Sequence, residues 1–172
     1  MTKGCLLFAL QICATSSLLF FLLNPVTQGA ELTKLTLDSA STLGTIVSTD
    51  PAVKQEGHGS IRISTLWPTT ICLAEVQGLN VEGAQLIYRA KVRSEKLEGT
   101  AFLEMWCSVG DGQYFSRGMN SVVTGTMDWS TLQTLFFLQP GQSAKMVTLN
   151  IVINGKGTVW VDDVHLLKEP LR

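Results

Sequence analysis

Charged side chains are scarce in this sequence. Only 16% of its 172 residues are Asp, Glu, Lys or Arg, and the formal net charge is −1. Lys3 is the only charged residue among residues 1–30, so without its single positive charge the rest of the chain is at −2. A protein that binds nucleic acid needs an excess of basic side chains to meet the phosphates. The composition therefore gives no support for a nucleic-acid partner.

Sequence patterns for metal binding and catalysis are missing as well. The chain has four cysteines and two histidines, but no Cys-x-x-Cys pair or Cys/His cluster that would indicate structural zinc. It contains neither Gly-x-Ser-x-Gly nor His-Glu-x-x-His. Glu75 and Glu104 are two carboxylates of the kind glycosidases use, but that mechanism depends on their separation, which a sequence does not give. We therefore expect no catalytic residues.

The cysteines divide between two parts of the chain. Cys5 and Cys13 fall in the N-terminal segment, whereas Cys72 and Cys107 fall in the rest. An oxidising compartment permits a disulfide between the latter two. Sequence alone does not give the separation of their Cβ atoms, so their pairing stays open.

The N-terminal segment is the one long apolar run. It extends from Leu6 to Leu23 after Lys3, and Asn24 and Pro25 end it. This arrangement is typical of a secretory signal peptide. The run is also about long enough to span a bilayer, so a retained membrane anchor is the alternative. We expect residues 1–30 to be a signal peptide or anchor and residues 31–172 to be a domain that is secreted, periplasmic or held at the cell envelope.

After residue 30, no helix-period stretch exceeds two turns. Instead, short stretches alternate apolar and polar residues and are separated by turn residues such as Asp50-Pro51 and Pro140-Gly141. The stretches expected to be strands are residues 32–39, 60–64, 69–76, 85–94, 100–109, 130–138, 145–154 and 157–167, with a hairpin return after residue 112. Short strands and turn signals at this spacing predict an all-β sandwich or barrel.

Four stretches carry a resemblance to a known fold family. They are Glu-Gly-His-Gly-Ser-Ile-Arg-Ile (56–63), Leu-Ile-Tyr-Arg-Ala-Lys-Val-Arg (86–93), Gly-Thr-Met-Asp-Trp (125–129) and Gly-Thr-Val-Trp-Val-Asp-Asp-Val (157–164). In this order they resemble the galactose-binding-like jelly-roll β-sandwiches, which include the carbohydrate-binding modules of bacterial cellulases and xylanases. The resemblance covers most of residues 31–168. It implies a jelly-roll fold and is much less specific for the ligand, because this fold hosts many functions.

Two adjacent aspartates interrupt the last apolar stretch. Alternation with Val164 and Leu166 predicts that Asp162 faces the core and that Asp163 faces outward. The resemblance implies that the strands of Arg62 and Arg89 are its neighbours, so we expect Asp163 to pair with Arg62, Arg89 or Lys91. A carboxylate on the core side must be hydrogen-bonded or coordinated. The resemblance implies one structural calcium ion near residues 57–60, with Asp162 as a ligand. The alternative is that Asp162 accepts hydrogen bonds from backbone N–H groups of that loop.

The stretch 100–109 predicts a ligand-binding face. Alternation places Phe102, Glu104 and Trp106 outward, while Leu103 and Met105 point inward. A hairpin turn at Asp111-Gly112 predicts that Arg117 lies opposite Trp106 and Met119 opposite Glu104.

Aromatic, carboxylate, amide and guanidinium groups together suit a ring that carries many hydroxyls. The residues predicted to bind carbohydrate are Trp106, Glu104, Arg117, Phe102, Phe115 and Asn150. We therefore expect a non-catalytic carbohydrate-binding module. The alternative is a structural or protein-interaction domain of the envelope, in which a loop covers these aromatics. Trp129 and Trp160 are expected to be core anchors.

The first prediction concerns the N-terminus. If residues 1–30 are a cleaved signal, mass spectrometry of the exported protein should find a chain that starts at or near Ala30 or Glu31, because cleavage after Gly29 places the small residue Thr27 at the −3 position. Recovery of a chain with intact Met1 in the membrane fraction would favour the anchor instead.

Overall fold

The computed structural model describes residues 29–35, 37 and 46–171, which form seven strands. The strands are β1 (Ala30–Leu35), β2 (Val47–Asp50), β3 (Ser60–Thr65), β4 (Thr69–Glu82), β5 (Ala84–Val109), β6 (Gly112–Phe137) and β7 (Ser143–Pro170). Every pairing between them is antiparallel. No helix in this part of the chain is long and apolar enough to cross a membrane. The predicted all-β jelly roll is confirmed, whereas the predicted signal or anchor lies almost wholly outside the described residues.

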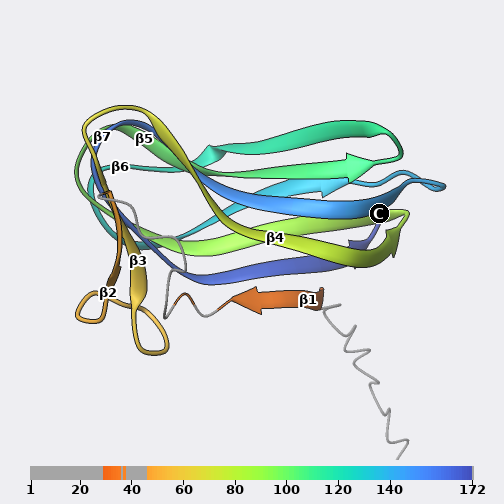
Figure 1. Ribbon diagram of the computed structural model, residues 1–172, viewed down its shortest axis with the longest axis horizontal. Coiled ribbons are helices and arrows are strands. Elements are labelled where there is room, and N and C mark those ends of the chain that lie inside the picture. The colour runs from red at the N-terminus through yellow and green to blue at the C-terminus, as the bar shows by residue number, and fades with distance from the viewer. Residues whose placement is uncertain (1–28, 36, 38–45, 172) are drawn as a thin grey trace, which may run out of the picture.

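Three long strands build both layers of the sandwich (Figure 1). In one layer, the strand order is β4, the first half of β7, the second half of β5 and the first half of β6. In the other layer, the remaining halves of these long strands continue, and β1 and β3 pair with β7. The sequence predicted separate strands at 85–94 and 100–109, and at 145–154 and 157–167. That division is wrong, because each pair is one bent strand.

The core fills the space between the two layers. Leu103 and Met105 of one layer and Leu86 and Val92 of the other are fully buried. Within each stretch they stand an even number of residues apart, as strand geometry requires for side chains on one face. Removing such side chains from water is the main favourable contribution to folding. The predicted inward positions of Leu103 and Met105 are therefore confirmed.

A pair of glycines allows β5 and β7 to bend together. Gly99 and Gly155 lie opposite one another, with φ of 122° and 156°. A Cβ on Gly99 would stand 2.1 Å from the carbonyl oxygen of Asn154, and a Cβ on Gly155 would stand 2.0 Å from that of Glu98. Asn154-Gly155 is a dipeptide typical of hairpin turns, but here it marks a close approach of two backbones inside a continuous strand pair.

A β-bulge at Asp163 corrects the predicted faces of β7. Asp163 has a φ of 49°, and the register of β7 with β5 shifts between Arg89 and Lys91. Because a bulge inserts one unpaired residue, the alternation changes sides there. Val164 faces the core as predicted, but so does Val161. Trp160 and Asp162 lie on the outer face, where the sequence analysis expected them to face the core.

The glycine pair gives a stability prediction. Gly99→Ala should lower the free energy of unfolding by about 3 kcal/mol or more, because the new Cβ meets a backbone oxygen and the φ is unfavourable for alanine. Gly110→Ala is the matched control. Its φ of 59° is also positive, but nothing lies within 4 Å of the added Cβ, so a loss of only about 1–2 kcal/mol is expected. Equal losses in urea denaturation would contradict the assigned contact.

Candidate functional site

The β5–β6 hairpin turns one residue earlier than the sequence predicted. Val109 pairs with Gly112, so the two turn residues are Gly110 and Asp111. Gly110 has a φ of 59° and occupies the first turn position, where type II′ turns place glycine. The register consequently shifts by two, and Arg117 lies opposite Glu104 while Phe115 lies opposite Trp106. The predicted pairings of Arg117 with Trp106 and of Met119 with Glu104 are therefore wrong, although Arg117 and Trp106 stay on the predicted face.

Four strands contribute to this outer face. One row of paired residues crosses the layer from Phe115 through Trp106 and Thr148 to Glu75. The next row runs from Arg117 through Glu104 and Asn150 to Cys72. Directly opposed residues on antiparallel strands share a face and lie close enough to interact. The structure therefore brings together the side chains of Trp106, Glu104, Arg117, Phe115 and Asn150, as the sequence analysis expected.

The buried carboxylate of Glu104 is bonded to three of these side chains. Its carboxylate accepts hydrogen bonds from Trp106 Nε1 at 2.8 Å, Arg117 Nε at 2.6 Å and Asn150 Nδ2 at 3.2 Å. Only 4% of the residue is exposed. A buried carboxylate needs such partners, and each bond fixes the orientation of its donor. Glu104 is therefore placed to position the other groups, where the sequence analysis expected it to contact the ligand.

The charge on Glu104 is maintained by its partners. Burial acts to raise the pKa of this carboxyl, but the hydrogen bonds from Arg117, Trp106 and Asn150 outweigh it and the pKa lies below its ordinary value. A lowered pKa in the folded state means that the carboxylate is ionised at neutral and mildly acidic pH. The stabilisation is lost only as the pH falls below the ordinary range of glutamate.

The aromatic part of the face is open to solvent. Phe115 is 51% exposed, and its ring centroid lies 5.0 Å from that of Trp106 at an interplanar angle of 43°. The guanidinium of Arg117 lies over the Phe115 ring, 4.7 Å from its centroid, and the Arg117 side chain is 48% exposed. Trp106 itself is partly exposed. Two aromatic rings and a fixed guanidinium are thus presented together.

Phe102 takes a different place from the other predicted residues. It lies opposite Val122 and Val152 and is only 5% exposed. A ring so covered supports the face and is not itself a contact surface. The sequence analysis placed Phe102 on the correct side of β5, but alternation does not show what covers a side chain.

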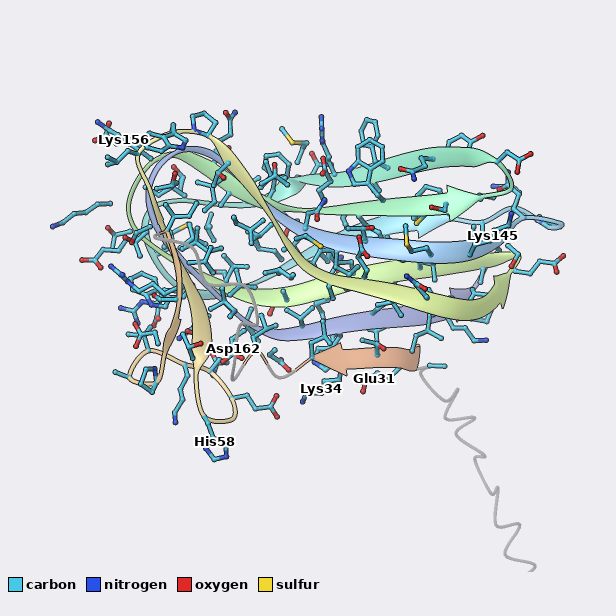
Figure 2. The ribbon with its side chains drawn as sticks, viewed as in Figure 1. Glu31, Lys34, His58, Lys145, Lys156 and Asp162 are labelled. Carbon is cyan, nitrogen blue, oxygen red and sulfur yellow. The ribbon has the colours of Figure 1, made fainter. Side chains whose placement is uncertain are left out.

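Asp162 holds the loop between β2 and β3. Its Oδ2 accepts the backbone N–H groups of Gln55 at 2.7 Å and Glu56 at 2.9 Å, and its Oδ1 accepts that of Asp163 at 2.8 Å. The residue is 2% exposed. Figure 2 shows it beside the loop that carries His58. This geometry supports the hydrogen-bonded alternative for Asp162.

The donor groups around Asp162 do not fit a cation site. Calcium is bound by oxygen ligands, whereas both oxygens of this carboxylate face N–H groups. Within the described residues, no group of three His, Cys, Asp or Glu side chains is placed to hold a metal ion. Calcium binding by Asp162 stays a prediction without support from the residues around it.

A second polar cluster joins β1 to β7. His165 Nδ1 lies 2.9 Å from Glu31 Oε2, and His165 Nε2 lies 2.7 Å from Asp163 Oδ1. Lys34 Nζ lies 3.5 Å from Asp163 Oδ1 and 2.6 Å from Glu56 Oε2. Burial acts to raise the pKa of Asp163, but the hydrogen bond to His165 and the charge of Lys34 lower it overall. The predicted pairing of Asp163 with Arg62, Arg89 or Lys91 is wrong, because the bulge turns its carboxylate toward β1.

Trp160 is buried without belonging to the core. It is 5% exposed on the outer face, with Arg62 and Arg93 at 5.8 and 5.7 Å from its ring centroid. Its Nε1 donates to Asp50 Oδ2 at 2.9 Å, and this bond lowers the pKa of Asp50. Trp160 is therefore an anchor for the β2–β3 end of the outer face, where the sequence analysis expected a core anchor.

The two cysteines in the domain are not joined. Cys72 is exposed on β4, in the row that contains Glu104, and Cys107 is buried between the layers. Burial raises the pKa of the Cys107 thiol to about 12. They lie on opposite sides of the sheet, which keeps the two thiols apart.

Asp162 gives a second stability prediction. Asp162→Asn should lower the free energy of unfolding by about 1–3 kcal/mol, because the amide retains one acceptor oxygen for three N–H donors. Asp111→Asn, in the exposed hairpin turn, is the control and should be neutral.

The calcium prediction has its own test. A melting temperature that falls on addition of chelator would show that calcium binds after all, and an unchanged value would remove the calcium prediction.

Comparisons with known proteins bear on the fold. No protein-family model and no curated protein matches this chain. The CBM22-1 xylan-binding domain of Xyn10C from Paenibacillus barcinonensis aligns with a TM-score of 0.56 and 12% identity, over 84% of this chain and 97% of that one. The C-terminal family 22 carbohydrate-binding module of Xyn10B from Clostridium thermocellum aligns with a TM-score of 0.53 and 15% identity, over 80% and 92%. A family 16 carbohydrate-binding module aligns with a TM-score of 0.51 and 13% identity, over 72% and 86%. These similarities confirm that the chain has the galactose-binding-like jelly-roll fold inferred from its sequence.

Proposed function

We propose that this protein is an exported, non-catalytic domain that binds carbohydrate on the outer face of β5, β6 and β7. The observation that carries the proposal is the open pair of rings, Trp106 and Phe115, beside a guanidinium that a buried carboxylate holds in place. Several solved structures of the same fold are described as carbohydrate-binding modules. At such low identity, these similarities support the fold alone. The argument for a ligand rests on the side chains of this chain.

Each exposed group has a role in the proposed complex. The apolar face of a sugar ring stacks on Trp106 or Phe115, because flat aromatic surfaces remove its C–H groups from water. Arg117 donates from its two Nη groups to ring hydroxyls, since its Nε is already bonded to Glu104. Asn150, one strand away, is fixed by the same carboxylate but is only 7% exposed, so like Phe102 it supports the face and is not itself a contact surface. Glu104 acts as a positioning residue, because all three of its donors belong to the face.

The same geometry argues for binding without catalysis. A general acid in a glycosidase needs a raised pKa so that it carries a proton near neutral pH. The pKa of Glu104 is lowered by its partners, and its oxygens already accept three hydrogen bonds. Such a carboxylate is unsuited to protonating a glycosidic oxygen. The site therefore favours recognition over hydrolysis.

A glycan array followed by titration with the best ligand tests the proposal. Trp106→Ala should weaken binding at least about tenfold, since a stacked aromatic group contributes on the order of 1 kcal/mol or more. It should lower stability by only about 1–2 kcal/mol, because the side chain is partly exposed. Trp67→Ala is the matched control, because Trp67 is 62% exposed and lies outside this face.

Two results would count against the proposal. An array on which no glycan binds would favour a structural or protein-interaction domain. A stability loss of about 3–5 kcal/mol in Trp106→Ala would mean that the indole is covered in solution, and the proposed site would then be closed to a ligand.

A further inference from the structure

A second group of exposed aromatic side chains lies at the edge formed by β6. Tyr114, Phe115 and Phe137 are 54%, 51% and 52% exposed. With Val109, Phe136 and two glutamines, Gln113 and Gln142, they line a groove of about 380 Å³. Contiguous apolar patches are uncommon on the surface of soluble proteins and often mark a binding surface. The sequence analysis did not identify this groove, because its residues come from the end of β5, from both halves of β6 and from the loop that follows.

The groove continues the face that carries Trp106. Phe115 lines the groove and also contacts the tilted ring of Trp106, with 5.0 Å between the ring centroids. The other lining residues come from the hairpin end of β5 and β6, from the end of β6 and from the loop before β7, which is the end of the molecule marked by Lys145 in Figure 2. A ligand that leaves Trp106 across Phe115 passes the guanidinium of Arg117 and then enters a groove whose lining carries no charged side chain.

The chemistry of the lining restricts the occupant. None of the seven residues that line the groove is charged. The guanidinium of Arg117 lies over the Phe115 ring where the groove meets the Trp106 face, so a uronate, a sulfated chain or a nucleic acid finds a cation at that boundary but none in the lining itself. The lining combines aromatic rings with two amide groups, and the amide of Gln142 is fixed because its Oε1 accepts the backbone N–H of Gln139 at 2.9 Å. Flat apolar faces bordered by hydrogen-bonding groups match neutral pyranose rings better than a purely apolar partner.

We propose that the groove is a second subsite, which binds the continuation of a neutral polysaccharide chain held at Trp106. This inference rests on the proposed function and adds the class of ligand, an extended uncharged glycan bound along its length. Affinity should therefore rise with chain length until both Trp106 and Phe137 are covered, because each subsite contributes its own stacking contacts.

The test is isothermal titration of the full chain with xylo- and galacto-oligosaccharides, from the disaccharide to the hexasaccharide. Phe137→Ala should weaken binding of the hexasaccharide by roughly threefold to tenfold, the size expected for an aromatic contact, and should leave binding of the shortest ligands unchanged. Met119→Ala is the control, since Met119 is 59% exposed on the same strand and does not line the groove. The melting temperature of each variant establishes that it is folded.

The outcomes separate this inference from the proposed function. If glycans bind with an affinity that depends on Trp106 but not on chain length or Phe137, the subsite is rejected and the proposed function stands. If no oligosaccharide binds, both fail together. Tighter binding of oligogalacturonides than of the neutral oligosaccharides would overturn the neutral class. Binding of a polyproline peptide that depends on Phe137 would identify the groove as a protein-recognition surface and overturn the inference.

Discussion

The pairing of β5 with β7 is the constraint on which the rest of the structure depends. These strands remain paired from Ala84 opposite Pro170 to Val109 opposite Ala144, through three register shifts and the bend at Gly99 and Gly155. Because one strand pair supplies the centre of both layers, β4, β6, β1 and β3 only have to add to its edges. The bend in turn requires that two backbones approach where neither residue has a Cβ. The geometry of the outer faces follows from this arrangement.

The candidate site shows how that frame is used. In the layer that holds the site, β5 lies between β6 and β7, so Glu104 has neighbours on both sides and can accept from Arg117 and Asn150. A carboxylate on an edge strand would reach one of them. The charge and hydrogen-bonding capacity of Glu104 are satisfied within the protein, while the Phe115 ring and the Arg117 side chain remain about half exposed. Preorganised groups of this kind lower the entropic cost of binding.

Much of the fold was predictable from local patterns, whereas the site was predictable only in composition. Alternation in residues 100–109 placed Glu104 and Trp106 correctly, because a strand has a period of two. Alternation did not show that the hairpin turns at Gly110. That turn shifts the register by two and places Arg117 opposite Glu104. The bulge at Asp163 likewise changes which side Asp162 occupies, and a bulge depends on the partner strand. The groove at Phe137 depends on both halves of β6, so tertiary contacts alone define it.

The two outer faces offer a comparison within one molecule. On one face, Trp160 lies between Arg62 and Arg93, and its Nε1 is bonded to Asp50. On the other, Trp106 also uses its Nε1 for a carboxylate, but its ring meets the exposed Phe115. Both indoles therefore satisfy their polar atom within the protein, and they differ in what covers the ring. Cation–π contacts with the two guanidinium groups help to cover the Trp160 ring, and the residue is only 5% exposed. Since the same chain covers one tryptophan and leaves the other accessible, exposure at Trp106 is a specific property of that face and is what a ligand would need.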